Sequence, residues 1–137
     1  MRSSQTKIVF TNGVFDIIHR GHIEYLSKAK AAGDFLIVGV NTDKSVKKIK
    51  GPHRPIQNQN DRATIVATLK PVDLVVLFEE STPENLIRFI KPDVLVKGAD
   101  YKISQIVGAD FVKSYGGVVK RIRLTSGRST SRILRRL

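Results

Sequence analysis

Apolar runs alternate along the chain with segments whose apolar residues recur at helical spacing. Five runs with little polar interruption are predicted to be strands, and they cover residues 7–12, 35–41, 73–78, 94–97 and 118–124. Helices are predicted over 22–32, from Asn60 or Asp61 to the residues before Pro71, from a cap at Ser81 to the residues before Pro92, over 105–114, and after a cap at Ser129. The polar stretch 42–59 contains two prolines and is predicted to be a loop.

Strict alternation of strands and helices is typical of a parallel sheet, because parallel neighbours need crossover connections. We therefore expect an α/β fold, a doubly wound five-stranded parallel sheet, in a single domain spanning 1–137. Ligands of such sheets bind beyond the carboxyl ends of the strands. Polar clusters follow four of the five strands, at 12–22, 41–54, 97–101 and 127–131. These clusters are predicted to meet at one edge of the sheet.

Charge is concentrated in two stretches. The net charge is +12, and residues 44–54 hold five basic residues and 120–137 seven, with no acid in either. The rest of the chain is neutral overall, which favours a local anion site over a coat that binds nucleic acid. A solvated basic surface and a nucleic-acid-binding module stay as alternatives. The chain has no cysteine and no apolar run long enough to span a bilayer, so we expect a cytoplasmic protein without disulfides or thiolate metal sites.

His19 and His22 stand three residues apart at a predicted helix start, after the turn that contains Gly13. Exposed N–H groups at a helix start attract anions, and Gly13 and Gly21 let the backbone approach a phosphate closely. Two imidazoles beside these groups indicate a polyphosphate site. The same pair could share a metal ion or be satisfied by local hydrogen bonds.

Other candidates carry open alternatives of the same kind. Asp16 or Asp43 could orient Mg²⁺ or a ribose hydroxyl, or could cap a turn. Lys97 and Gly98 could face a nucleotide base, or could only end a strand. Hydroxyls at 129–131 could form a second anion site, or an ordinary helix cap.

Several reaction classes lack their motifs. We find no serine–histidine–acid arrangement, no cysteine nucleophile, no paired carboxylates, no phosphate-binding loop of the Gly-x-x-x-x-Gly-Lys type and no Gly-x-Gly-x-x-Gly. A site rich in cations and hydrogen-bond donors, without a covalent catalyst, suits direct in-line attack on phosphorus.

Residues 11–22, Thr-Asn-Gly-Val-Phe-Asp-Ile-Ile-His-Arg-Gly-His, resemble the signature of the cytidylyltransferase-like nucleotidyltransferase superfamily with its His-x-Gly-His motif. The rest of the chain resembles one branch, the bacterial D-glycero-β-D-manno-heptose 1-phosphate adenylyltransferases (ADP-heptose synthases). The segments that carry this likeness are 37–43, 50–51, 54–56, 61–62, 78–83, 91–101, 106–108, 116–117 and 129–131. The resemblance implies a Rossmann-like fold and transfer of AMP from ATP to the heptose 1-phosphate, giving ADP-heptose and pyrophosphate for the lipopolysaccharide core.

The resemblance also implies roles for particular residues. His19 and His22 would hold the ATP phosphates and stabilise the transition state. Lys47, Lys50 or another lysine of the stretch 44–50 would neutralise the β,γ-phosphates. Arg62 would make a contact near the edge of the active site or with the sugar phosphate. Mg²⁺ would accompany ATP without protein ligands of its own. The residues expected around the nucleotide are Thr11, Asn12, Gly13, Phe15, Asp16, Gly21, Asp43, Lys47, Lys97, Gly98, Asp100, Tyr101, Ser129 and Thr130.

Two positions depart from related patterns. Leu124 stands where related cytidylyltransferases carry arginine, and Ala99 replaces a common glycine. The resemblance further implies a homodimer, no nucleic-acid or membrane partner, and a separate heptose kinase that acts upstream. A glycerol-3-phosphate cytidylyltransferase, or another enzyme of small phosphate esters, is the alternative activity.

Overall fold

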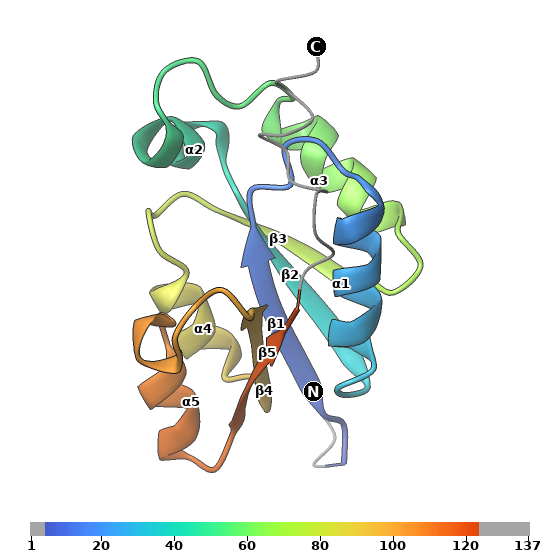
Figure 1. Cartoon of the computed structure of the whole chain (residues 1–137), viewed down its shortest axis with the longest axis vertical. Helices are drawn as coiled ribbons and strands as arrows, with labels where there is room; N and C mark the ends of the chain where they lie inside the picture. Colours follow the sequence, from blue (N-terminus) through green and yellow to red (C-terminus); the bar gives the residue numbers. More distant parts are fainter. Residues whose placement is uncertain (1–4, 124–137) are drawn as a thin grey trace.

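The computed structural model describes residues 5–123, and these form one five-stranded sheet between two layers of helices (Figure 1). The strands are β1 (Ile8–Gly13), β2 (Phe35–Asn41), β3 (Leu74–Phe78), β4 (Val94–Gly98) and β5 (Val118–Ile122). All pairs are parallel and the order is β3-β2-β1-β4-β5. The predicted doubly wound parallel sheet is confirmed. A single domain over 1–137 stays a prediction.

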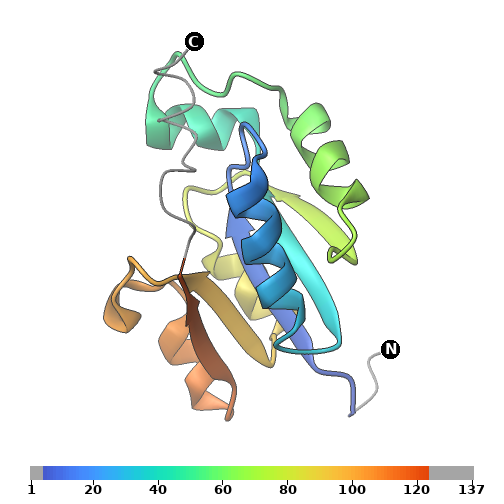
Figure 2. The same ribbon diagram turned by 45° about the vertical axis from the view of Figure 1, so that its right-hand side comes forward.

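The helices are α1 (Arg20–Lys30), α2 (Asp43–Lys50), α3 (Gln59–Thr68), α4 (Glu84–Ile90) and α5 (Ala109–Ser114), with a 3-10 turn at Ile103–Gln105. Helices α1 and α3 cover one face of the sheet, and α4 and α5 cover the other (Figures 1 and 2). Each face has its own apolar core, because neighbouring residues of a strand point to opposite sides. Val9 of β1 packs with Leu26 of α1, whereas Phe10 packs with Ile87 of α4.

Helix α2 is an element that the sequence analysis placed in a loop. Thr42 caps it, and the Thr42 hydroxyl accepts a hydrogen bond from the backbone N–H of Ser45. Gly51 ends it at a φ of 97°, a conformation that glycine adopts without strain. Val46 is its fully buried apolar side chain. The helix therefore lacks the apolar stripe by which the other helices were predicted from the sequence.

Several element ends also differ from the predictions. The cap of α3 is Asn58 rather than Asn60 or Asp61, since the Asn58 side chain accepts from the backbone of Asp61. Ser81 does not cap α4, which begins at Glu84 after Pro83. Of the helix predicted over 105–114, only Ala109–Ser114 is helical as α5, while Gln105 ends the 3-10 turn and residues 106–108 belong to neither element. The predicted last helix and Leu124 lie outside the described residues.

The chain builds β1, β2 and β3 towards one side of the sheet and then returns to place β4 on the other side of β1. This reversal creates a switch point between β1 and β4, where ligands of such folds bind beyond the carboxyl ends of the strands. Figures 1 and 2 show α2 beyond that same edge. Within residues 5–123, no helix is both long and apolar enough to cross a membrane.

Candidate active site

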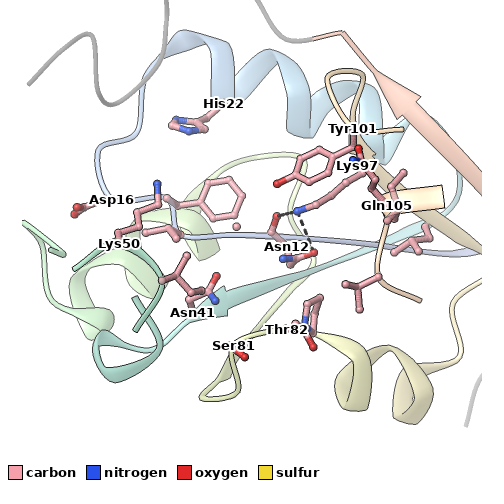
Figure 3. Close-up of a pocket in the computed structure, with 18 of the residues that line it drawn as sticks. Asn12, Asp16, His22, Asn41, Lys50, Ser81, Thr82, Lys97, Tyr101 and Gln105 are labelled. Atoms are coloured by element: carbon pink, nitrogen blue, oxygen red, sulfur yellow. Dashed lines mark hydrogen bonds between the residues drawn. The ribbon is translucent and has the colours of Figure 1, made fainter. Parts of the chain in front are cut away.

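A pocket of about 380 Å³ lies at the carboxyl edge of the sheet. Figure 3 shows Lys50 and Asp16 at one end, Tyr101 and Gln105 at the other, and Asn12 between them. The expected site residues that line it are Asn12, Gly13, Phe15, Asp16, His22, Lys50, Lys97 and Tyr101. The structure thus brings together three of the predicted clusters. Ser129 and Thr130, from the fourth, lie outside the described residues.

The two histidines form a reciprocal cap at the start of α1. His19 is the N-cap residue, and its Nδ1 accepts a hydrogen bond from the backbone N–H of Gly21 at 3.1 Å. The backbone N–H of His19 donates in turn to Nδ1 of His22 at 3.2 Å. A ring nitrogen that accepts a hydrogen bond carries no proton, so each neutral ring has its proton on Nε2. This tautomer, assigned from the hydrogen bonds, makes each imidazole a donor to an anion.

The rings lie close together, with centroids of His19 and His22 4.0 Å apart, and His22 also meets the edge of Phe15 at 5.4 Å. Phe15 adopts a φ of 51°. A Cβ at Gly13 would lie 2.9 Å from the Phe15 ring, so this packing requires glycine at position 13. The turn therefore holds an aromatic surface against His22 in the pocket wall.

Burial, together with the charges of the nearby His19 and Lys50, lowers the pKa of His22 from 6.5 to about 4. The unfolded chain then binds a proton at His22 more readily than the folded chain does between these two pH values, so the free energy of unfolding falls as the pH drops through that window.

We expect the free energy of unfolding of His22→Gln to fall less than that of the wild type when the pH is lowered from about 7 to about 5, because the variant lacks the buried imidazole. Urea denaturation would measure both changes. His53→Gln removes an exposed histidine outside the pocket and is the matched control. Equal losses in His22→Gln and the wild type would contradict the assignment.

Lys97 lies beside Tyr101 at one end of the pocket and reaches towards Asn12 (Figure 3). Its Nζ donates to the backbone oxygen and to Oδ1 of Asn12, both at 3.4 Å, and lies 5.1 Å from the centre of the Tyr101 ring. Burial lowers the pKa of Lys97, and the charge of Asp100 partly opposes this shift. Asp100 itself is exposed in the turn after β4. The side chains of Lys97 and Tyr101 thus offer a cation and a ring face to a ligand at this end of the pocket.

Asp16 is fixed by the segment that connects α2 to α3. The Asp16 carboxylate is 1% exposed and accepts hydrogen bonds from Nε of Arg54 at 2.9 Å and from the backbone N–H groups of Ile56 and Gln57. Burial alone would raise the pKa of Asp16, but these hydrogen bonds and the Arg54 charge hold it below its usual value. Asp16 therefore anchors the segment at the pocket rim.

Arg62 is fully buried and does not line the pocket. Its Nε donates to the backbone oxygen of Gln57, and its Nη1 donates to the backbone oxygens of Val14 and Asn41 at 2.8 and 2.7 Å. Its Nη2 pairs with Asp43 at 2.9 Å. The structure thus places Arg62 beneath the site, where it joins three loops. The expected contact with a sugar phosphate is corrected to this internal role, because every nitrogen of the guanidinium donates to protein.

Some expected nucleotide contacts also lie beside or beneath the pocket rather than in its wall. Thr11 is fully buried, and its hydroxyl bonds to the Tyr25 hydroxyl and to the backbone oxygen of Val96. Thr11 therefore links β1 to α1 and β4, which corrects its expected place in the nucleotide pocket.

Residues that likewise do not line the pocket are His19, Gly21, Asp43, Lys47, Gly98 and Asp100. His19 lies behind His22, which is the histidine of the motif in the pocket wall. Lys47 and Lys50 are both exposed on α2, and Lys50 is the one that lines the pocket.

The sequence analysis missed part of the wall. Side chains that line the pocket and were not proposed include Asn41, Ile49, Arg54, Ser81, Thr82, Gln105, Ile106 and Val107. Ser81 and Thr82 follow β3, and the same rule that selected the clusters after the other strands could have found them. Arg54 belongs to the predicted cluster 41–54, but its contact with Asp16, 38 residues earlier, has no signal in the sequence because only the fold brings the two together.

The pocket offers cations, hydroxyls and imidazole donors around one space. Lys50, Arg54 and Lys97 line it together with one carboxylate, that of Asp16. Among residues 5–123, no group of three histidine, aspartate or glutamate side chains is arranged to hold a metal ion. Such a wall can bind and neutralise a polyphosphate, which is the requirement for phosphoryl or nucleotidyl transfer by positioning.

Comparison with known proteins agrees with this chemistry. A family model described as cytidylyltransferase-like matches residues 10–136. Proteins named "Bifunctional protein HldE" are similar, at 54% identity over 136 residues in Caulobacter sp. (strain K31) and 55% over 136 residues in Wolinella succinogenes. These matches cover 99% of this chain and 28% of either relative.

Solved structures share the fold. The lipopolysaccharide core biosynthesis protein from Thermoplasma volcanium superposes with a TM-score of 0.69 at 34% identity, over 88% of this chain and 97% of that one. The pantoate-beta-alanine ligase from Francisella tularensis has a TM-score of 0.64 at 18% identity, over 95% of this chain and 63% of that one, and shows the fold alone. From the family match and these relatives, the chain belongs to the cytidylyltransferase-like family and is a nucleotidyltransferase.

Proposed function

We propose that the chain transfers AMP from ATP to D-glycero-β-D-manno-heptose 1-phosphate, giving ADP-heptose and pyrophosphate for lipopolysaccharide core synthesis. The observation that carries the proposal is the pocket itself, which gathers His22, Lys50 and Lys97 at the switch point of the sheet. The relatives named HldE and the lipopolysaccharide core biosynthesis protein support the choice of substrate.

The reaction needs little acid–base chemistry. An oxygen of the sugar phosphate attacks the α-phosphorus of ATP in line, a new P–O bond forms, and the bond to the β-phosphate breaks as pyrophosphate leaves. The attacking phosphate is already ionised at neutral pH, so no side chain has to remove a proton from it. The protein supplies orientation and stabilises the charge that develops on the phosphate oxygens.

The two ends of the pocket suggest how the substrates divide it. Tyr101 and Lys97, with Asn12 and Phe15, would border the nucleotide, while His22 would donate from Nε2 to the phosphates. Lys50 would meet the β,γ-phosphates. Hydroxyl and amide groups on the opposite wall would bind the hydroxyls of the sugar, and they come from Asn41, Ser81 and Thr82.

Mg²⁺ would reach the site on the phosphate oxygens of ATP and supply positive charge there. The carboxylates expected to orient it, Asp16 and Asp43, are engaged by Arg54 and Arg62 and do not form a protein cage for the ion. A cytoplasmic location, a homodimer, an upstream heptose kinase, and the lack of nucleic-acid or membrane partners complete the proposal.

A substrate panel tests this function. Pyrophosphate release would be measured with ATP or CTP, each paired with heptose 1-phosphate, glycerol 3-phosphate and other sugar or polyol phosphates. We expect ATP with the heptose 1-phosphate to give the highest kcat/KM, by at least about tenfold, the ratio that about 1.4 kcal/mol of differential transition-state binding supplies. A preference for CTP with glycerol 3-phosphate would overturn the proposal in favour of a cytidylyltransferase of small phosphate esters.

A further inference from the structure

We propose that Arg54 is a fixed receptor for a phosphate group of a substrate at the Lys50 end of the pocket, and that Asp16 is the residue that positions it. This inference deepens the proposed function and rests on it, since it assumes substrates that carry phosphate. It adds a binding residue from the segment between α2 and α3, and it gives Asp16 a role without ligand contact.

The Arg54 side chain is held in one orientation. Its Nε donates to Oδ2 of Asp16 at 2.9 Å, and the exposed fraction of the Asp16 side chain is 1%. Asp16 cannot turn away easily, because the backbone N–H groups of Ile56 and Gln57 donate to the same carboxylate. A guanidinium fixed before the ligand arrives loses little conformational entropy on binding.

The guanidinium keeps donors for a ligand. Nη2 of Arg54 is buried and has no hydrogen-bond acceptor within residues 5–123. Buried donors in folded proteins are nearly always paired, so an unmatched one in a residue of the pocket wall indicates an acceptor that arrives with a ligand. The planar fork of an arginine fits two oxygens of one phosphate, which makes phosphate the ligand chemistry that suits it best.

The local charge favours an anion. Figure 3 shows Lys50 beside Asp16, and Arg54 pairs with the same Asp16. Asp16 is the one acid among the described residues of the pocket wall, so a net positive charge remains at this end. Burial lowers the pKa of Lys50, the charge of Arg54 lowers it further, and Asp16 opposes both, which agrees with two cations close to one carboxylate. A bound phosphate would relieve the repulsion between these cations.

Two substrates carry this chemistry, the nucleotide with its terminal phosphates and the sugar with its phosphate monoester. The experiment compares Arg54→Gln and Arg54→Lys with Arg88→Gln, which removes an arginine paired with Glu84 outside the pocket. Steady-state KM would be measured for ATP and for the sugar phosphate. Calorimetry would measure binding of ATP, pyrophosphate and inorganic phosphate, and thermal melting would report folding.

We expect Arg54→Gln to raise the KM of one phosphate-bearing substrate at least about tenfold, or about 1.4 kcal/mol of binding, with a smaller change in kcat. The substrate affected identifies the phosphate. Arg54→Lys should restore part of the affinity, and Arg88→Gln should behave as wild type. If both KM values and all three binding constants stay within about twofold of wild type, whatever the melting temperature does, the inference is wrong.

Two further arms keep the inference separate from the proposed function and from folding. If no substrate pair is turned over, the proposed function fails, and calorimetry with pyrophosphate and phosphate still decides on Arg54. If Arg54→Gln does not fold, Arg54→Lys decides, with an expected loss of affinity of about threefold or more that follows from losing the bidentate fork.

Asp16→Asn tests the positioning role and should raise the same KM. The KM of the double variant should be little higher than that of Arg54→Gln alone. Additive shifts would overturn the positioning role of Asp16.

Discussion

His22→Ala and His19→Ala are each expected to lower kcat by at least about a hundredfold, the scale for removing one preorganised donor to a charged transition state. The backbone N–H of His19 and that of Gly21 fix both rings by occupying their Nδ1 atoms, so the Nε2 protons are set before the substrate binds. The hydrogen bonds that these Nε2 groups donate would strengthen as charge develops on the α-phosphate. The measurement is pyrophosphate release at saturating ATP and heptose 1-phosphate.

Because His19 also caps α1, its loss could act through folding. His19→Asn separates the two effects, since asparagine is a good N-cap but cannot supply the imidazole donor. We expect this variant to melt near the wild-type temperature and to remain as slow as His19→Ala. His53→Ala removes the third histidine, which is exposed and belongs neither to the cap of α1 nor to the pocket wall, and should keep the wild-type rate. Wild-type turnover in both alanine variants of the pair would refute the proposed role of the motif.

Arg62→Met is expected to lower the free energy of unfolding by about 3 kcal/mol or more, and the melting temperature by roughly 10 °C. The substitution leaves the backbone oxygens of Val14, Asn41 and Gln57 without the donor that each has in the wild type. Each buried acceptor left unmatched costs about 1–3 kcal/mol. Urea and thermal denaturation would measure the change.

Two comparisons make this prediction specific. Arg88→Met removes an arginine whose side chain is 54% exposed, pairs with Glu84 across one helical turn and lies 4.7 Å from the centre of the Phe111 ring, and it should change stability by about 1 kcal/mol or less. Arg62→Lys keeps the charge but not the planar fork, so it should fall between wild type and Arg62→Met. A normal melting temperature for Arg62→Met, together with a raised KM for the sugar phosphate, would restore the direct contact expected from the sequence.

The sheet was predictable because each strand is a compact apolar run between polar turns, as at 35–41. Helix α2 was not, because its stability depends on its ends and on few buried groups. The hydroxyl of Ser45 donates to the backbone oxygen of Glu80, and Val46 packs inward, while Ile49 stays exposed at the pocket. With lysines at most other positions, the segment has the composition of a loop.

The site was predictable where residues stand at the end of a strand or in the turn after it, as Asn12 and Tyr101 show. It was not predictable where a side chain crosses the fold. The contact of Asp16 with Arg54, and the burial of Arg62, depend on how the segment between α2 and α3 folds back on the turn after β1. Neither the tautomer of the histidines nor the choice of Lys50 over Lys47 can be read from residue spacing.

The bonding of Arg62 limits how this protein can change in length. One rigid guanidinium spans the turn after β1, the end of β2 and the segment before α3, so these three must keep a common geometry. An inserted or deleted residue in one segment would move its carbonyl oxygen away from the guanidinium, which the bonds to the other two segments hold in place. Length variation should therefore be rare in these three segments, although loops in general tolerate insertions and deletions.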